Sequence, residues 1–223
     1  MTASTKALPA RFRSAPPAQE RSRETMERFA RATEELLQER PFEDITVQDI
    51  ARRAQRPIGS FYARFESKDA LLPVLYRRYH DSLEDVFAAK LSRLDWPVLG
   101  FVPTLEAIVD LLIGAYDERR WLIRAMALFT RLRPDALPKD VIPRRKKLYE
   151  GIVGIVLRHR KRIRHEDPAA AVRFGLFLVE STMREKLLFG GAPHAKATPL
   201  GKGALRAELV RALHGYLSAE APR

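Results

Sequence analysis

The feature that most constrains this chain is a helical spacing of apolar residues, which continues from residue 21 nearly to the C-terminus. Apolar side chains recur at steps of three and four residues, and no segment alternates apolar and polar residues as a half-buried strand does. The pattern therefore predicts an all-helical fold. Its interruptions predict helices over residues 21–40, 46–54, 57–65, 67–94, 104–117, 119–132, 143–160, 167–189 and 202–218.

Composition and motif content exclude several classes of protein. The 223 residues include no cysteine, which excludes a disulfide scaffold, thiolate metal sites and a cysteine nucleophile. No G-x-S-x-G or H-E-x-x-H motif is present, and residues 201–203 lack the remaining parts of a phosphate-binding loop. No apolar run approaches the roughly 20 residues of a membrane span, and no signal peptide is evident. We therefore expect a cytoplasmic protein without enzyme activity, cofactor, metal or membrane contact.

The N-terminal residues 1–17 are polar, contain three prolines and show no periodicity. They predict a disordered tail. An arm of this kind can also enter a DNA minor groove, although an idle tail is the simpler interpretation.

Two short helices joined by a tight turn are predicted after the first long helix. Thr46 is the expected N-cap of the first, and Asp49 completes a capping box. Pro57 is expected at the first position of the second. Together with the preceding helix over residues 21–40, this arrangement is a helix-turn-helix.

Residues 46–72, TVQDIARRAQRPIGSFYARFESKDALL, resemble the DNA-binding signature of the TetR (tetracycline-repressor) family. The ungapped matches to the family pattern are Thr46, Ile50, Ala51, Ala54, Gly59, Tyr62, Phe65, Lys68 and either Leu71 or Leu72. The resemblance in amino-acid sequence covers about residues 21–94. Beyond residue 94, only the helical architecture resembles the family. The resemblance implies a helix-turn-helix domain over residues 18–66, followed by a helical domain over residues 67–223 that binds an effector and forms the dimer.

The turn of the motif departs from the family pattern. Gln55 replaces the family's glycine at a position where a positive φ is expected. Arg56 and Pro57 replace the usual valine and serine, so one customary backbone contact to a phosphate is lost and Arg56 becomes a substitute donor.

The candidate DNA contacts divide by chemistry. Small and polar residues on the second short helix are suited to base edges in the major groove, and basic or hydroxyl groups around it are suited to phosphates. The candidates are Thr46, Arg56, Pro57, Ile58, Gly59, Ser60, Tyr62, Arg64 and Lys68. We expect Ile58 and Ser60 to contact base edges, and Arg64 to reach a guanine or a phosphate. We expect Tyr62, Lys68 and the helix end at Thr46 to hold phosphates.

By resemblance, the helices near residues 167–189 and 202–218 form the homodimer. In the last of these, leucines 205, 209, 213 and 217, with Val210 and Tyr216, are a plausible bundle face. Burial in the chain's own core is compatible with the same pattern.

Polar and aromatic residues inside the apolar helices are candidates for an effector pocket. They are Asp110, Tyr116, Trp121, Arg124, Phe129, Phe177 and Glu180. Aromatic residues at helical spacing are also common core residues, and Arg124 and Glu180 are equally suited to structural ion pairs. The pocket is expected between the four helices over residues 104–189.

The net charge of +12 lies wholly in the middle of the chain, because residues 119–164 hold 15 basic and 3 acidic residues. A basic surface in contact with solvent would explain this excess of basic residues. The more specific alternative is that they bind an anionic effector, such as an acyl-thioester. Asp110 and Glu180 favour a cation instead.

The sequence therefore predicts a repressor that binds a palindromic operator in double-stranded DNA as a homodimer and is released by a small-molecule effector. The alternatives are a regulator without an effector, and a helical small-molecule-binding or adaptor protein that has lost DNA recognition.

Overall fold

The structure is a computed structural model that describes residues 18–92, 95–133 and 138–220, and the expected tail over residues 1–17 lies outside them. The described residues form helices and no strand. The helices are α1 (Ala18–Glu39), α2 (Val47–Arg53), α3 (Ile58–Tyr62), α4 (Leu72–Leu91), α5 (Phe101–Glu118), α6 (Arg120–Leu132), α7 (Val141–Leu157), α8 (Pro168–Met183), α9 (Pro193–Ala197) and α10 (Lys202–Ser218). None of them is long and apolar enough to cross a membrane.

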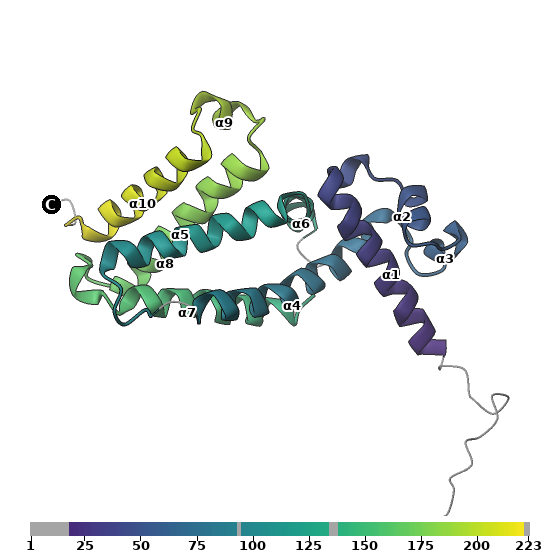
Figure 1. Cartoon of the computed structure of the whole chain (residues 1–223), viewed down its shortest axis with the longest axis horizontal. Coiled ribbons are helices and arrows are strands. Elements are labelled where there is room, and N and C mark those ends of the chain that lie inside the picture. The colour runs from purple at the N-terminus through teal and green to yellow at the C-terminus, as the bar shows by residue number, and fades with distance from the viewer. Residues whose placement is uncertain (1–17, 93–94, 134–137, 221–223) are drawn as a thin grey trace, which may run out of the picture.

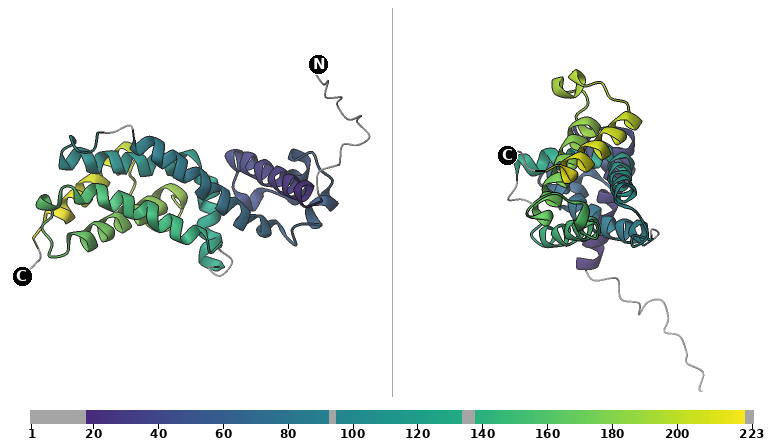
Figure 2. Two further views of the ribbon diagram at one scale, coloured as in Figure 1. Left: turned by 90° about the horizontal axis from the view of Figure 1, so that it is seen from below. Right: turned by 90° about the vertical axis from the view of Figure 1, so that its left-hand side faces the viewer.

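The described part of the molecule is elongated, with α1, α2 and α3 grouped at one end (Figures 1 and 2). Helix α4 runs from this group into a bundle built by α5, α7, α8 and α10. Helix α6 lies between the two parts and packs against both α1 and α4. The three-helix end and the bundle are therefore connected through two helices, α4 and α6.

Side-chain caps mark the starts of α2 and α8. Thr46 accepts a hydrogen bond from the Asp49 amide at 3.1 Å, and the Asp49 carboxylate accepts one from the Thr46 amide at 3.1 Å, so the predicted capping box is confirmed. The Asp167 carboxylate caps α8 by accepting hydrogen bonds from two backbone amides at 3.0 Å, and Pro168 follows at the first helical position. These caps satisfy amides that have no partner within the helix.

Three expected helix boundaries were wrong, and one short helix was not expected. Ser67 makes no capping bond through its side chain and precedes a 3-10 turn over Lys68–Leu71, so α4 begins only at Leu72. Pro57 is the N-cap of α3 and not its first residue. The single helix expected over residues 167–189 changes to a π-helical segment at Arg184–Leu188. The sequence analysis also missed α9, because its five residues are too few to establish a periodic pattern.

The turn between α2 and α3 contains the positive φ that the sequence analysis anticipated. Gln55 has φ 53°, the one positive φ of a non-glycine residue among those described. In this left-handed conformation a Cβ crowds the backbone and costs about 1–2 kcal/mol per residue.

Gln55→Gly is therefore expected to raise the free energy of unfolding by about 1 kcal/mol, because glycine adopts this φ without strain. Gln55→Ala is the matched control, since it keeps the Cβ. Urea unfolding of the two variants measures the difference. Equal stabilities of the glycine and alanine variants would show that the strain is absent.

Two clusters of buried side chains hold the molecule together. The first joins the helix-turn-helix to its neighbours around Phe29, which lies edge-to-face against Phe61 at 5.3 Å and Phe65 at 6.3 Å. This cluster continues into α6 through Leu122 and Met126. The second fills the bundle of α5, α7, α8 and α10. Since α6 shares the core of the helix-turn-helix, a displacement of α6 acts directly on that end of the molecule.

The leucines of α10 do not form an external bundle face. Leu205, Leu209, Leu213 and Leu217 are all buried within the chain, where α10 packs on α5 and α8. Gly175 of α8 permits this close packing, because a Cβ at that position would lie 2.6 Å from Leu213. Of the two interpretations of these leucines, the structure therefore supports burial in the chain's own core, and the apolar residues left exposed nearby belong to α8.

Candidate DNA-binding helix and candidate effector cavity

Helix α3 presents a small and partly apolar face at the end of the molecule. Phe61 is fully buried beneath it, while Pro57, Ile58, Gly59 and Tyr62 are exposed. A Cβ built on Gly59 meets no heavy atom within 4 Å, so the fold does not require glycine there. A face without bulk allows the helix backbone to approach another surface closely, as a helix in the major groove must.

The side chains predicted to read bases differ in their exposure and in the hydrogen bonds that they already make. Ile58 is 39% exposed, and Ser60 is half-buried. Arg64 folds back on α3, where its Nη1 donates a hydrogen bond to the Ser60 carbonyl at 2.9 Å. Arg56 is half-buried as well. Either arginine must therefore change rotamer before it reaches a base or a phosphate.

Lys68 is already engaged within the chain. Its ammonium group donates hydrogen bonds to the carbonyls of Phe42 and Ile45 at 2.7 Å and of Glu43 at 3.3 Å, and it lies 4.6 Å from the centre of the Phe42 ring. Burial lowers the pKa of Lys68, and nearby carboxylates partly oppose this shift. The side chain ties the start of α4 to the Phe42–Asp44 turn. Sequence reasoning missed this contact, because the partners are backbone carbonyls of a distant segment.

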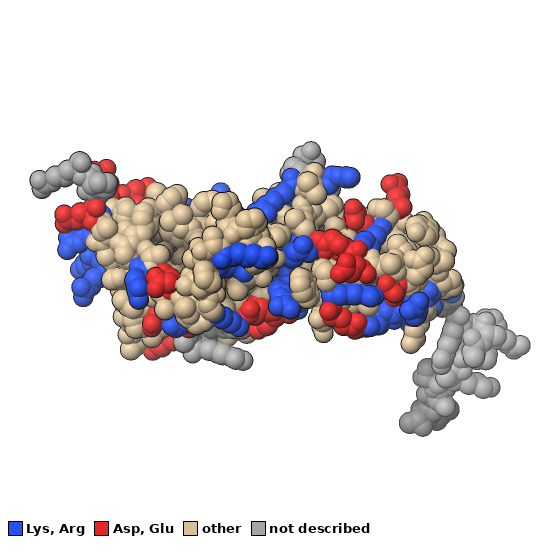
Figure 3. All heavy atoms as spheres, turned by 90° about the horizontal axis from the view of Figure 1, so that it is seen from above, with Lys and Arg blue, Asp and Glu red and all other residues tan. Residues whose placement is uncertain are grey.

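The other two predicted phosphate contacts are Tyr62, the last residue of α3, and Thr46, the N-cap of α2. Tyr62 is 55% exposed, and its ring lies edge-to-face against Phe61 at 5.6 Å. Thr46 is exposed, although its hydroxyl also donates a hydrogen bond to Asp49 at 2.8 Å. The face drawn in Figure 3 carries basic and acidic side chains interspersed along its length, without a continuous basic surface.

A cavity of about 190 Å³ lies between α4, α5, α6, α7 and α8. Its wall combines apolar side chains with tyrosines and charged groups. Helix α4 contributes Tyr76, Tyr79, His80, Leu83 and Phe87 from successive turns. The cavity lies between the four helices where the sequence analysis expected one, and α4 is an additional wall.

The charged groups of the cavity are Glu180, Arg145 and Arg184, with Arg131 beside them. Burial raises the pKa of Glu180, and the two arginines at 145 and 184 oppose that shift. Burial disfavours the charge of Arg145, but Glu180 and nearby tyrosines outweigh it and raise its pKa. Arg145 still has accessible surface, which includes its part of the cavity wall.

Two of the seven predicted effector residues, Tyr116 and Glu180, line this cavity. Asp110 lies outside it and pairs with Arg206, with oxygen-to-nitrogen distances of 2.5 and 2.8 Å. Arg124 pairs with Glu43 at 2.9 Å.

The three remaining aromatic candidates also lie outside the cavity. Trp121 lines a separate hollow near the π-helical segment, Phe129 is buried in the first core cluster, and Phe177 is 56% exposed on α8. The residues that sequence reasoning missed are chiefly those of α4. Their signal was the polar His80 inside an apolar helical stripe.

Most of the basic run lies away from the cavity. The five basic residues between positions 158 and 164 are exposed around the 3-10 turn Arg160–Arg162, at the end of the bundle that is remote from α3. The solvated interpretation therefore accounts for this part of the charge. Of the basic residues that the structure describes in segment 119–164, only Arg131 and Arg145 line the cavity.

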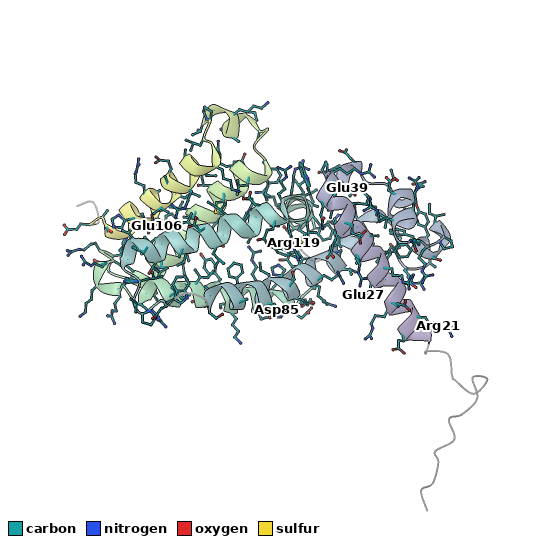
Figure 4. The ribbon with its side chains drawn as sticks, in the orientation of Figure 1. Arg21, Glu27, Glu39, Asp85, Glu106 and Arg119 are labelled. Carbon is teal, nitrogen blue, oxygen red and sulfur yellow. The ribbon has the colours of Figure 1, made fainter. Side chains whose placement is uncertain are left out.

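Helices α5 and α4 are also joined beside the cavity. Arg119, labelled in Figure 4, follows the end of α5, and its Nη1 donates a hydrogen bond to Ser82 Oγ of α4 at 2.9 Å. Arg78 of α4 pairs with Glu27 and Glu34 of α1. Helix α4 is therefore held at both the cavity and the helix-turn-helix.

The arrangement defines a class of protein: a DNA-binding regulator with an N-terminal helix-turn-helix and a helical second part. The N-terminal part of the chain carries the DNA-binding domain of the TetR family. Residues 30–75 match the family model described as bacterial regulatory proteins, tetR family. This match contains α2 and α3 whole and the start of α4.

Solved structures share the fold over most of both chains. A TetR family transcription regulator from Marinobacter aquaeolei VT8 has 16% identity and a TM-score of 0.56, covering 89% of this chain and 98% of that one. A regulatory protein in the tetR family from Rhodococcus RHA1 has 14% identity and a TM-score of 0.58, covering 88% and 98%. A putative TetR-family regulator from Mesorhizobium loti has 15% identity and a TM-score of 0.51, covering 92% and 98%. No curated protein matches the chain. Identities this low establish the fold alone.

Proposed function

We propose that this protein is a homodimeric transcriptional repressor that binds a palindromic operator and leaves it when a small molecule occupies the cavity. The observation that carries the proposal is the connection of one exposed recognition helix, α3, to one interior cavity through α4 and α6. We propose residues 18–66 as the DNA-binding domain and residues 67–223 as the effector-binding and dimerisation domain.

In the proposed complex, α3 enters the major groove with Gly59 at its closest approach. Ile58 and Ser60 contact base edges, and Tyr62 and the start of α2 at Thr46 contact phosphates. Arg56 and Arg64 join the interface after a rotamer change. Lys68 acts mainly by fixing the start of α4, since its ammonium group already has three carbonyl partners.

The proposed dimer forms through α8 and α10. Phe174, Phe177 and Leu178 are 43–56% exposed on one face of α8. Helix α10 adds small exposed residues, including Ala204, Ala207 and Gly215, which allow a partner helix to approach closely. An exposed apolar patch of this kind is characteristic of a protein interface.

Coupling between cavity and DNA requires an element that contacts both. Helix α6 meets this requirement, because Ile123 and Met126 line the cavity and also belong to the core cluster of the helix-turn-helix. On another face of α6, Arg124 pairs with Glu43 in the turn before α2. An effector that displaces α6 thereby shifts the helix-turn-helix, and its effect is limited by its differential affinity for the two conformations.

Arg124→Gln is expected to reduce the factor by which an effector weakens DNA binding, by up to about fivefold, because a partly exposed ion pair contributes about 0.2–1 kcal/mol. Effector affinity in the absence of DNA should stay unchanged. Arg173→Gln is the matched control, since it breaks a comparable Arg173–Glu150 pair away from this junction. An equal loss of coupling in both variants would contradict the role of Arg124.

The assignment of contacts is tested on DNA that flanks the protein's own gene. Tyr62→Phe should weaken binding to all sequences about equally, whereas Ser60→Ala should act at particular base positions. Competition with single-base operator variants separates the two effects. If Tyr62→Phe changed base preference and Ser60→Ala did not, the proposed roles would be reversed. If the chain bound no DNA but did bind small molecules, a ligand-binding or adaptor protein would replace the proposal.

A further inference from the structure

The polar groups of the cavity gather at the end nearest the helix-turn-helix. Tyr76 and His80 occupy the first half of α4, Arg145 lies near the start of α7, and Glu180 and Arg184 lie where α8 ends. Tyr116 of α5 belongs to the same polar group, because it interacts with Glu180 and Arg184. Burial raises the pKa of Tyr116.

The opposite end of the cavity is apolar. Helices α4 and α7 lie side by side. Arg144 of α7 donates hydrogen bonds to two carboxylates of α4, Glu84 at 2.8 Å and Asp81. Phe87 follows His80 by seven residues, and Ile152 follows Arg145 by seven. At a rise of 1.5 Å per residue, the apolar end is about 10 Å from the polar end. The cavity is thus polar at one end and apolar at the other.

The polar end holds an excess of positive charge. Arg145 and Arg184 face one carboxylate, Glu180, and among the described residues neither arginine forms an ion pair with it within 4.0 Å. A third arginine, Arg131, is exposed at the wall and lies 5.4 Å from the Phe189 ring. Arginines at a cavity wall can bind a carboxylate directly, and such contacts are often bidentate. A bound carboxylate would reduce this excess of positive charge.

We infer that the cavity binds a small monocarboxylate whose apolar body is about the size of one aromatic ring. Its carboxylate lies between Arg145 and Arg184, and its body lies against Phe87 and Ile152. This inference rests on the proposed function, since it names the chemical class of the proposed effector. The volume of about 190 Å³ supports the size, because a cavity of about 150 Å³ holds benzene. The bulk of an acyl-thioester carrier exceeds it.

Glu180 has a defined part in this arrangement. Its carboxylate repels an entering anion, and burial already favours its protonated form by raising its pKa. Protonation of Glu180 on binding removes the repulsion and leaves two arginines for the bound carboxylate. Glu180→Gln is therefore expected to strengthen binding of a carboxylate several-fold.

Titration calorimetry of the full chain without DNA tests the inference with three compounds of similar shape: phenylacetate, phenylacetamide and phenethylamine. We expect phenylacetate to bind at least about tenfold more tightly than the amide, because a charged hydrogen-bonded pair is lost in the amide, and the amine to bind weakest. Octanoate in the same titration distinguishes a chain from a ring as the apolar body. Failure of both carboxylates to bind, or tighter binding of the amide or amine, overturns the inference.

Single substitutions distinguish binding at this site from a general effect of the protein's positive charge. Arg145→Met and Arg184→Met should each weaken phenylacetate binding at least about tenfold, while binding of the amide changes little. Arg158→Met removes the same charge from the exposed turn and should have no effect. Circular dichroism checks that each variant folds. If Arg145→Met does not fold, Arg184→Met and Glu180→Gln decide the matter. Unchanged phenylacetate affinity in a folded arginine variant overturns the inference.

An operator-release assay distinguishes this inference from the proposed function. Carboxylate binding without release of DNA would leave the inference standing and contradict the repressor mechanism. Release by amines or neutral compounds alone would support the mechanism and overturn the inference.

Discussion

Phe177→Glu is expected to convert the proposed dimer into a monomer and to weaken operator binding at least about thirtyfold. Phe177 is 56% exposed beside Phe174 and Leu178, so its ring contributes little to the fold of the single chain. In a two-fold interface the substitution places a charge on both sides, and a central aromatic residue typically contributes about 2 kcal/mol or more to binding. Analytical ultracentrifugation and a DNA titration measure the two effects.

Val98→Glu is the control for this experiment, because Val98 is 79% exposed and lies in the segment between α4 and α5. It should leave both assembly and DNA affinity unchanged. A Phe177→Glu protein that stayed dimeric would place the interface elsewhere, and a monomeric protein with full operator affinity would show that DNA binding needs no dimer.

The second large effect concerns acid stability and originates at His80. This side chain is 5% exposed on α4 between Tyr76 and Tyr79, and burial lowers its pKa to about 4, with Arg145 and Arg144 of α7 adding to the shift. The unfolded chain binds the proton more readily, so stability falls as the pH falls from about 6.5 to about 4. The loss attributable to His80 approaches about 3 kcal/mol at the lower limit.

His80→Gln should remove this component and flatten the pH dependence of unfolding between these limits, as urea titrations at several pH values would measure. His194→Gln, which removes an exposed imidazole from α9, is the control. Parallel pH profiles for the wild-type protein and the His80 variant would contradict a buried, neutral imidazole.

Local signals explain why so much of the helix-turn-helix could be predicted. The Thr46–Asp49 capping box involves residues three apart, and the positive φ of Gln55 follows from the tight turn between two short helices. Contacts between neighbours in sequence leave a pattern in the sequence. The spacing of apolar residues at steps of three and four likewise predicted nearly every long helix.

The functional contacts were harder to predict, because they join segments far apart. The partners of Lys68 are backbone carbonyls more than 20 residues away, and Arg124 finds Glu43 across 81 residues. Aromatic and charged residues inside apolar helices mark buried faces, but they do not tell which face borders a cavity. For this reason Tyr116 and Glu180 line the cavity while Asp110 pairs with Arg206 outside it.

The central claim is that two copies of this chain read a palindromic site through α3. Hydroxyl-radical footprinting of the full chain on the DNA flanking its gene tests it most directly. The account predicts two symmetric protected segments about 34–36 Å apart or somewhat more, bound by two copies and lost in Gly59→Trp, which the fold accommodates because open space surrounds that position. Protection of one unpaired segment, or an unchanged footprint with Gly59→Trp, would contradict the account.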